Sequence, residues 1–528
     1  MTDFVIVIWY NKKWKNALLT KGEKIMANFK ENLGRYMDAG FPIIYIDTFE
    51  EEKVDGIIRE VVGGRGIIEW TTMGFRDFKS KIIESDWSLL DTLKYLIQDP
   101  KSCSRRVLVL KDAVKALRED SEVISLIKRL SINITSGVED FEDFNIIILS
   151  NVVVIPEELE KYMTILSMDY LTQDEIKDVV NSFCDEMELE SLRPQFLNEL
   201  SLAFKGLSEL EINNILALAV FEGGNINAGD LRLITEQKKQ VIRKSGILEM
   251  ISDNVRDNIK NIGGLESLKK WLERKSKVYK NINEAEKFGV DMPKGVLIAG
   301  MPGCGKSLSA KATAMLFGVP LLRMDMGRLM GKYVGESEAN MRKAIKLAEA
   351  ISPCVLWIDE MEKAFAGIGG NGGGSDVTTR LFGTFLTWLQ EKESMAFVVA
   401  TANDISNLPP ELMRKGRFDE IFFVNLPNDK ERKNIFEIHI KRRREQDLKN
   451  INITELVNNT KGYSGADIEG VVKTAIEEVF SDGRKYLSTN DILKAIRETH
   501  SLSEIMKDSI DKINKFYKQY KFKNASEE

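Results

Sequence analysis

Cysteine and histidine are both rare in this chain. Its 528 residues include four cysteines and two histidines, His439 and His500. Four cysteines are too few for a disulfide framework in a chain of this length, which favours a reducing compartment and predicts a cytoplasmic protein. Two histidines cannot supply a histidine-rich zinc site, and the sequence has no His-Glu-x-x-His protease motif.

Long apolar runs and a large excess of one charge are also missing. No stretch reaches the roughly 18 apolar residues that a membrane-spanning helix needs, so no membrane partner is expected. The 75 basic and 81 acidic residues give a formal net charge of −6. That balance lacks the basic excess of a dedicated nucleic-acid-binding protein. With 43% hydrophobic and 30% charged residues, the composition is that of a folded protein, and the length allows three or four domains.

The first 25 residues fit poorly with the rest of the chain. They begin with an apolar stretch that no basic segment precedes, which is not typical of a signal peptide. The codons for Lys21, Gly22 and Glu23 can spell a ribosome-binding site just before Met26. Two interpretations remain open, a leader that translation from Met26 would omit and a genuine N-terminal extension.

A phosphate-binding loop is the strongest motif. Residues 294–299 form a short apolar run typical of a buried parallel strand, and residues 300–307 read Gly-x-x-x-x-Gly-Lys-Ser. The glycines let backbone N–H groups face phosphate oxygens, Lys306 supplies a positive charge, and the Ser307 hydroxyl can ligate Mg²⁺. Residues 308–317 are expected to form a helix whose N-terminus faces the anion. The sequence therefore predicts ATP and Mg²⁺ as ligands.

An acidic pair and an asparagine follow two further apolar strands. Asp359 and Glu360 follow residues 354–358, and Asn403 follows residues 396–402. Because the carboxyl ends of parallel strands meet at one edge of a sheet, we expect Asp359 to hold Mg²⁺ and Glu360 to activate the attacking water. Asn403 would contact the γ-phosphate or that water. An acidic pair that only caps a turn is the alternative.

Two arginines, Arg414 and Arg417, follow on a turn that we expect to be exposed. They could pair with any acid. The functional interpretation is that they act as arginine fingers on the γ-phosphate bound by a neighbouring subunit.

The order and spacing of these motifs resemble the classical clade of AAA ATPases over residues ~260–500. The resemblance implies a P-loop α/β module with helices on both faces of a parallel sheet, a helical lid, and assembly into a ring, expected to be a hexamer. It places a histidine of this family, here His439, near the ribose; a cation at a helix end is the alternative for this residue. The nucleotide-binding residues so expected are Ile262, Gly263, Gly300, Pro302, Gly303, Cys304, Gly305, Lys306, Ser307, Leu308, His439, Gly465 and Ala466.

A loop between the phosphate loop and the acidic pair carries Tyr333, Val334 and Gly335. It exposes apolar side chains with no evident core partner. In the resembled family this triplet lines the central channel and grips an extended polypeptide, and the glycine-rich residues 367–375 match a second pore loop. Packing of Tyr333 at a subunit contact is the alternative.

Cys304 lies inside the phosphate loop, beside Lys306 and a helix N-terminus. Both neighbours favour a thiolate, so we expect alkylation of Cys304 to block nucleotide binding. A small residue that only fits the loop is the alternative.

The N-terminal half repeats the same order of strands without a nucleotide motif. Residues 42–47 match the strand before the phosphate loop, but the acids at 50–52 follow where glycines are needed, and would repel phosphate. Lys111 and Asp112 stand where the second half has Asp359 and Glu360. We interpret this half as a degenerate AAA-like module, with an unrelated α/β domain as the alternative.

These observations predict the domain order of the chain. The expected parts are a leader (1–25), a degenerate AAA-like α/β domain (26–172) with a helical lid (173–240), a helical connector (241–260), the AAA core (261–428), its lid (429–511) and a frayed tail (512–528). This arrangement resembles the AAA proteins of plastid and cyanobacterial genomes and their bacterial relatives.

The predicted function is that of a cytoplasmic Mg²⁺-ATP-dependent ATPase that forms a homo-oligomer and remodels a protein client as a chaperone-like unfoldase. The alternative is a nucleotide-gated regulatory scaffold that turns ATP over slowly and threads nothing. A nucleic-acid motor is disfavoured by the net charge.

Overall fold

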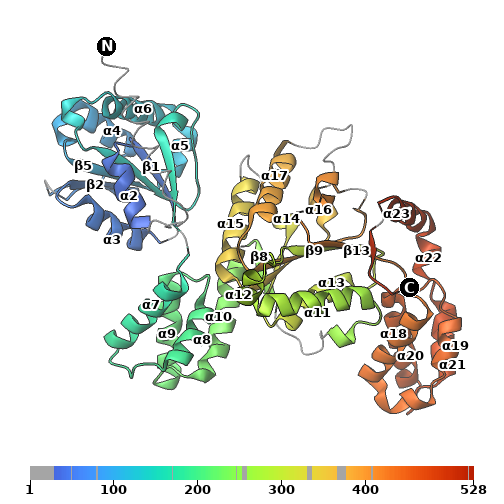
Figure 1. Cartoon of the computed structure of the whole chain (residues 1–528). Coiled ribbons are helices and arrows are strands. Elements are labelled where there is room, and N and C mark those ends of the chain that lie inside the picture. Colours follow the sequence, from blue (N-terminus) through green and yellow to red (C-terminus); the bar gives the residue numbers. More distant parts are fainter. Residues whose placement is uncertain are drawn as a thin grey trace. The chain divides into compact units, whose positions relative to one another are not determined.

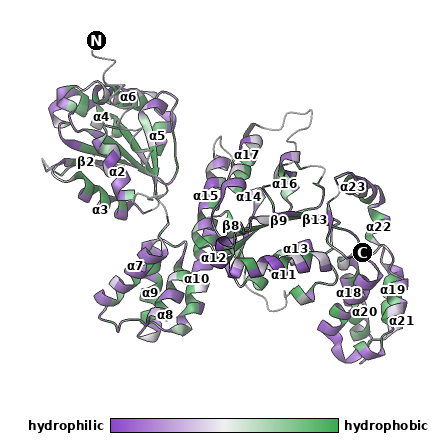
Figure 2. Cartoon of the chain, viewed as in Figure 1, coloured by the Kyte–Doolittle hydropathy of each residue, from purple (hydrophilic) through white to green (hydrophobic). Residues whose placement is uncertain are grey.

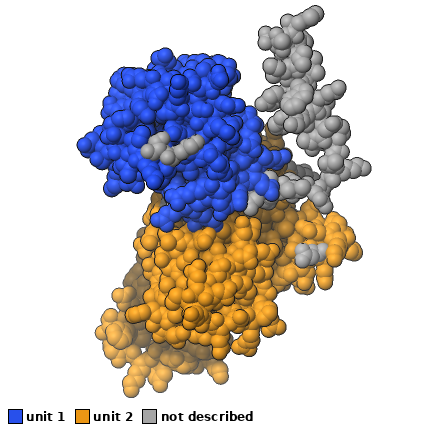
Figure 3. All heavy atoms as spheres, turned by 90° about the vertical axis from the view of Figure 1, so that its left-hand side faces the viewer, with its two compact units in different colours: residues 1–169 blue, residues 170–528 orange. Residues whose placement is uncertain are grey.

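The chain folds into two compact units, residues 1–169 and 170–528, which Figures 1 and 3 show. The computed structural model describes residues 29–527 except 49, 79–80, 169, 245, 252–258, 330–335, 366–375, 406–407, 415 and 521. Among the helices of these described residues, none is both long and apolar enough to span a membrane.

The first unit is built on a seven-stranded sheet in the order β4-β3-β2-β5-β6-β1-β7. Its strands are β1 (Ile43–Asp47), β2 (Gly66–Thr71), β3 (Gly74–Asp77), β4 (Ile82–Glu84), β5 (Arg106–Lys111), β6 (Asn145–Ser150) and β7 (Met163–Ser167). The helices that accompany it are α2 (Phe29–Asp38), α3 (Glu51–Val62), α4 (Leu89–Gln98), α5 (Val114–Glu119) and α6 (Ser121–Thr135). Strand β6 is buried along its whole length, as expected for the centre of a sheet that is covered on both faces.

The second unit contains another seven-stranded sheet, in the order β14-β13-β9-β12-β11-β10-β8. Its strands are β8 (Leu248–Ile251), β9 (Gly295–Gly300), β10 (Leu321–Met324), β11 (Cys354–Ile358), β12 (Ala396–Ala402), β13 (Glu420–Val424) and β14 (Lys523–Asn524). The helices that accompany this sheet are α11 (Glu266–Lys280), α12 (Ile282–Lys287), α13 (Lys306–Phe317), α14 (Met326–Leu329), α15 (Glu336–Ile351), α16 (Met361–Phe365) and α17 (Asp376–Glu391). Figure 2 shows hydrophobic residues gathered on the strands of both sheets.

The two sheets share one strand order, which confirms the prediction of a repeated module. The parallel strands β2-β5-β6-β1-β7 of the first unit correspond in chain order to β10-β11-β12-β9-β13 of the second. The turn that follows the strand matches as well, because Asp112 after β5 has φ 57° and Glu360 after β11 has φ 50°. A positive φ is uncommon for residues other than glycine, so both modules keep the same sharp turn at this edge.

Two helical bundles complete the second unit. The first comprises α7 (Gln173–Glu186), α8 (Pro194–Phe204), α9 (Glu209–Gly223) and α10 (Leu231–Lys244), and the second comprises α18 (Asp429–Arg444), α19 (Ile453–Asn458), α20 (Gly465–Ser481) and α21 (Thr489–Glu498). Capping boxes at Ser208 and Ser464 start α9 and α20. The first bundle contacts the segment between α15 and β11 directly, since Lys205 Nζ donates to the Ser352 carbonyl at 2.7 Å.

The predicted helical connector is wrong in part. Helix α10 ends at Lys244, and residues 248–251 form the edge strand β8, which pairs antiparallel with β10. Leu248 is buried in the same hydrophobic cluster as Ile242 and Ile247. Pairing with the edge of β10 therefore stabilises this segment in an extended conformation.

The predicted frayed tail is also wrong. After α22 (Leu502–Ile505), helix α23 (Lys507–Tyr520) packs Ile510 and Ile513 against Met301 and Phe423. Strand β14 then pairs in parallel with β13. The C-terminal segment thus covers one edge of the sheet, next to the start of the phosphate loop.

Candidate nucleotide site

The phosphate loop links β9 to α13. Gly303 has φ 70° and Gly305 has φ 89°, conformations that favour glycine. A Cβ at Gly303 would lie 2.9 Å from the Cβ of Ala466 on the lid. A Cβ at Gly300 would lie 2.1 Å from the carbonyl oxygen of Val424, so this first glycine is required by the sheet itself.

Lys306 is 7% exposed at the first turn of α13. Its ammonium group donates to the carbonyl oxygens of Gly300, at 2.9 Å, and Met301, at 2.7 Å. Burial lowers the pKa of Lys306 to about 8. A buried ammonium bonded to carbonyls is a site that an anionic phosphate would neutralise, so the loop fits a nucleotide phosphate.

Asp359 follows β11 and faces the phosphate loop. The Ser307 hydroxyl lies 3.4 Å from Asp359 Oδ1, and the Thr401 hydroxyl donates to the same oxygen at 2.6 Å. Arg323 on β10 lies 3.6 Å from Oδ2. Hydroxyl and carboxylate oxygens are the ligands that Mg²⁺ prefers, so Ser307 and Asp359 fit the predicted metal site.

Glu360 and Asn403 meet at the same edge. The Asn403 side-chain amide donates to Glu360 Oε1 at 3.4 Å, and Lys363 lies 2.6 Å from Oε2. Glu362 accepts the backbone N–H of Asn403 at 3.0 Å. The acidic pair and the asparagine are therefore held in one hydrogen-bonded group.

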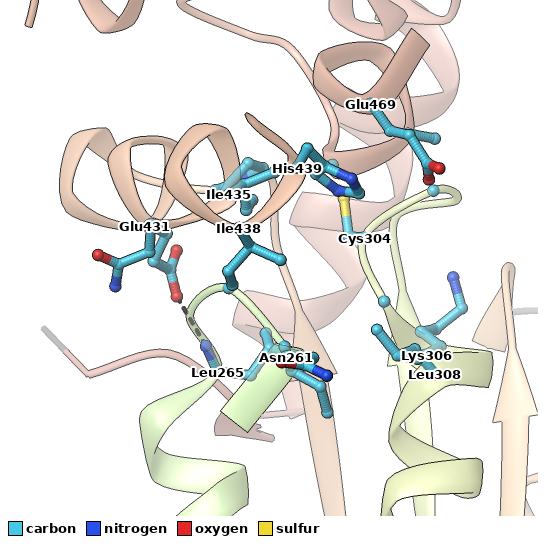
Figure 4. Close-up of a pocket in the computed structure, with 18 of the residues that line it drawn as sticks. Asn261, Leu265, Cys304, Lys306, Leu308, Glu431, Ile435, Ile438, His439 and Glu469 are labelled. Atoms are coloured by element: carbon cyan, nitrogen blue, oxygen red, sulfur yellow. Dashed lines mark hydrogen bonds between the residues drawn. The ribbon is translucent and has the colours of Figure 1, made fainter. Parts of the chain in front are cut away.

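The lid closes the site from the other side. A cavity of about 1400 Å³ lies between core and lid, and Figure 4 shows the residues of α18 that reach into it. Glu431 Oε1 accepts the backbone N–H of Leu265 at 3.0 Å. The first turn of α20 reaches the phosphate loop, because the Ala466 N–H donates to the Gly303 carbonyl at 2.9 Å.

His439 lines this cavity from within α18, which continues to Arg444. The helix-end interpretation is therefore wrong. Burial lowers the pKa of His439 to about 4, so the ring is neutral at pH 7. Arg443 lies 3.3 Å from Nδ1, and because a guanidinium can only donate, Nδ1 accepts and Nε2 carries the proton.

The predicted thiolate at Cys304 is wrong. Burial raises the pKa of Cys304 to about 11, although the nearby Lys306 opposes that shift. Loss of hydration outweighs the neighbouring positive charge, so the thiol is protonated at neutral pH.

Most of the predicted nucleotide-binding residues line the cavity. Those that line it are Ile262, Gly263, Pro302, Gly303, Cys304, Gly305, Lys306, Ser307, Leu308, Asp359, Glu360, Asn403, His439, Gly465 and Ala466. Gly300, Arg414 and Arg417 are not among its lining residues. The predicted pore triplet, residues 333–335, lies outside the described residues, and so does the second pore loop.

Several lining residues have no motif that would have revealed them. They include Asn261, Leu265, Thr401, Glu431, Ile435, Ile438 and Glu469. The capping box of Asn428 and Glu431 is visible as Asn-x-x-Glu and marks the start of α18. It gives no sign that the same glutamate also bonds Leu265, 166 residues away.

The corresponding edge of the first unit has the opposite arrangement of charge. Only residues 48–50 separate β1 from α3, and Glu51 opens that helix where Lys306 opens α13. Burial and nearby Asp112 raise the pKa of Glu51. Lys111, in the place of Asp359, lies 2.6 Å from Asp55 and 2.8 Å from Glu69.

Family models match four parts of the chain. Residues 296–426 match the ATPase family associated with various cellular activities (AAA), and residues 450–494 match the AAA+ lid domain. Residues 29–168 and 174–245 match the N-terminal and second domains of SpoVK-like AAA ATPases.

The chain is also similar to known proteins, to two of them over nearly its full length. It is 35% identical to the "Uncharacterized AAA domain-containing protein ycf46" of Guillardia theta, over 96% of this chain and 99% of the relative. The protein of the same name from Pyropia yezoensis is 35% identical over 94% and 99%. The "Proteasome-activating nucleotidase" of Thermococcus onnurineus is 34% identical over 45% of this chain and 60% of the relative.

Proposed function

This chain belongs to the AAA ATPase family of ATP hydrolases, and from that premise we propose that it is a Mg²⁺-dependent, ring-forming machine that remodels a protein client. One observation carries the proposal. The phosphate loop, the acidic pair, Asn403 and two lid helices border a single cavity, so nucleotide exchange would change the position of the lid relative to the core.

In this proposal each polar group has one task. Lys306 and the loop amides bind the phosphates. Ser307 and Asp359 would hold Mg²⁺, which would supply positive charge to offset that of the phosphate oxygens. Glu360 orients and deprotonates the attacking water, while Asn403 holds Glu360 in place. The neutral His439 donates to a ribose hydroxyl through Nε2.

We propose that copies of the chain assemble into a ring, and the lining of the cavity supports this. No arginine of the proposed finger pair lines it, and Arg414 is exposed on its own subunit. A cation supplied by a neighbouring copy would complete charge stabilisation of the γ-phosphate. We propose a hexamer in which Arg414 and Arg417 act on the site of the adjacent subunit. We also propose that the protein works in a reducing compartment, where its four free cysteines stay reduced.

The second candidate function is a regulatory scaffold without threading. The first unit favours it, because a module that retains the fold but carries acids in place of a phosphate loop offers a binding platform rather than a motor. Both candidates hydrolyse ATP and differ in whether Tyr333 acts on a polypeptide.

The ATPase rate in the presence of a permanently unfolded polypeptide separates the two candidates. For the remodeller, reduced and carboxymethylated lactalbumin stimulates the wild type, and Tyr333→Ala abolishes stimulation while basal turnover remains. Tyr486→Ala is the matched control, because Tyr486 is 70% exposed on the lid. A polypeptide that stimulates neither protein, or that stimulates Tyr333→Ala fully, would support the scaffold instead.

A further inference from the structure

The Thr401 hydroxyl touches both members of the acidic pair. It donates to Asp359 Oδ1 at 2.6 Å and accepts the backbone N–H of Glu360 at 3.2 Å. Thr401 is 1% exposed on β12, so water does not compete for these bonds. The rotamer of Asp359 is therefore set from the side of the sheet, with Oδ1 directed toward the Ser307 hydroxyl.

The first unit supplies an internal comparison. The β11–β12 register pairs Ile358 with Ala400, and the β5–β6 register pairs Lys111 with Leu149. With Lys111 in the place of Asp359, the residue in the place of Thr401 is Leu149. Asp112 nevertheless keeps φ 57° there, as Glu360 keeps φ 50°.

This comparison separates two roles that the hydroxyl could have. The sharp turn after the strand forms in the first unit with a leucine at that position, so the turn does not require the hydroxyl. The hydroxyl is present in the module that has the carboxylate, and absent in the module that has lost it. The comparison therefore links the Thr401 hydroxyl to the Asp359 carboxylate rather than to the turn.

We propose that Thr401 is a positioning residue that orients Asp359 for Mg²⁺. A hydrogen bond to one carboxylate oxygen fixes the direction of its lone pairs, and groups of this kind commonly change metal affinity or activity about 10–100-fold when removed. Arg323, 3.6 Å from Oδ2, limits rotation from the other side. The inference rests on the proposed Mg²⁺ role of Asp359.

The test measures nucleotide binding rather than turnover. In the Glu360→Gln background, which blocks hydrolysis, binding of a fluorescent ATP analogue is titrated with Mg²⁺ and, separately, in EDTA. We expect Thr401→Val to raise the half-saturating Mg²⁺ concentration about tenfold, with binding in EDTA within a factor of two of the parent. Thr401→Ser keeps the hydroxyl and should restore most of the loss.

The control is a second buried threonine. Thr313→Val removes a hydroxyl that, among the described residues, donates only to the Ser309 carbonyl, at 2.7 Å, and should leave the Mg²⁺ titration unchanged. Thermal melting of every variant shows which are folded. If Thr401→Val does not fold, the Mg²⁺ titration of Thr401→Ser is the test. A Thr401→Val titration equal to the parent, or a Thr401→Ser loss as large as that of valine, would overturn the inference. If the parent itself binds equally with and without Mg²⁺, the proposed metal role fails first.

Discussion

The buried ammonium group of Lys306 donates to two carbonyl oxygens. Within the described residues, no carboxylate is bonded to it. Burial disfavours its charged form and lowers its pKa to about 8. A bound phosphate stabilises the charged form and raises that pKa. Nucleotide binding near pH 8 and above is therefore coupled to proton uptake at this residue.

We expect the affinity for ATP to fall as the pH rises above 8. The decrease should approach, at most, about tenfold per pH unit, because one proton is taken up on binding. Below pH 7 Lys306 is already charged, so it adds no further pH dependence to the affinity for ATP. Calorimetry at pH 8.8 in buffers of different ionisation enthalpy measures the uptake directly, and a Lys306→Arg variant, which stays charged, should show none.

Residue roles could be predicted from the sequence where a contiguous motif carries them. The phosphate loop and the acidic pair are such motifs, and their members line one cavity. The bond from Leu265 to Glu431 could not be predicted, because it joins residues 166 positions apart. The thiol of Cys304 was misjudged because its charge state depends on burial, which local charges do not reveal.

At the scale of elements, the C-terminal segment completes the sheet. Tyr517 on α23 stacks on Phe423 of β13 with ring centroids 4.2 Å apart. The Ala525 N–H then donates to the Phe423 carbonyl. The sequence prediction of a frayed end failed because a two-residue strand and one amphipathic helix carry no recognisable motif, and their stability comes from the sheet edge that they cover.

Truncation of the stacked ring tests this account. Tyr517→Ala should lower the free energy of unfolding of the second unit by about 1–2 kcal/mol, through lost burial and aromatic contact. Tyr486→Ala, at a 70% exposed ring, should change it by less than about 0.5 kcal/mol. Chemical denaturation followed by circular dichroism measures both, and equal effects would contradict the packing of α23.

A second element-scale feature is the ion-pair group at the edge of the first sheet. Burial opposes the charge of Lys111, but Asp55 and Glu69 outweigh that effect and raise its pKa. All three side chains are less than a quarter exposed. Removing the lysine would leave two carboxylates close together without a partner.

Lys111→Met should therefore destabilise the first unit by about 3 kcal/mol at pH 7. Lys111 also opposes the rise in the pKa of Glu51, so without it Glu51 protonates more readily and the defect should shrink as the pH falls toward 4. ATP binding should remain at the wild-type level, since the site belongs to the second unit. Melting curves at two pH values and one binding titration check all three expectations; a loss of ATP binding would contradict the assignment.

At the scale of the whole molecule, the chain joins a module with a complete nucleotide site to one that keeps the same strand order without it. The repeat of the module was predictable because buried strands and their terminal residues recur in the same order along the sequence. The sequence did not show that the first helical bundle belongs to the second unit. Contacts such as that of Lys205 with Ser352 hold it there. Under the proposed function, hydrolysis at the nucleotide site of the second unit would drive the assembly, and the first unit would serve as a binding platform.

The most direct test of this account combines ATPase rate with mass in solution, for the wild type and Glu360→Gln, with and without ATP. The account predicts that the wild type hydrolyses ATP, and that Glu360→Gln binds ATP, fails to hydrolyse it and accumulates as a hexamer only when ATP is present. A Glu360→Gln protein that binds ATP and stays monomeric at every concentration would contradict the ring.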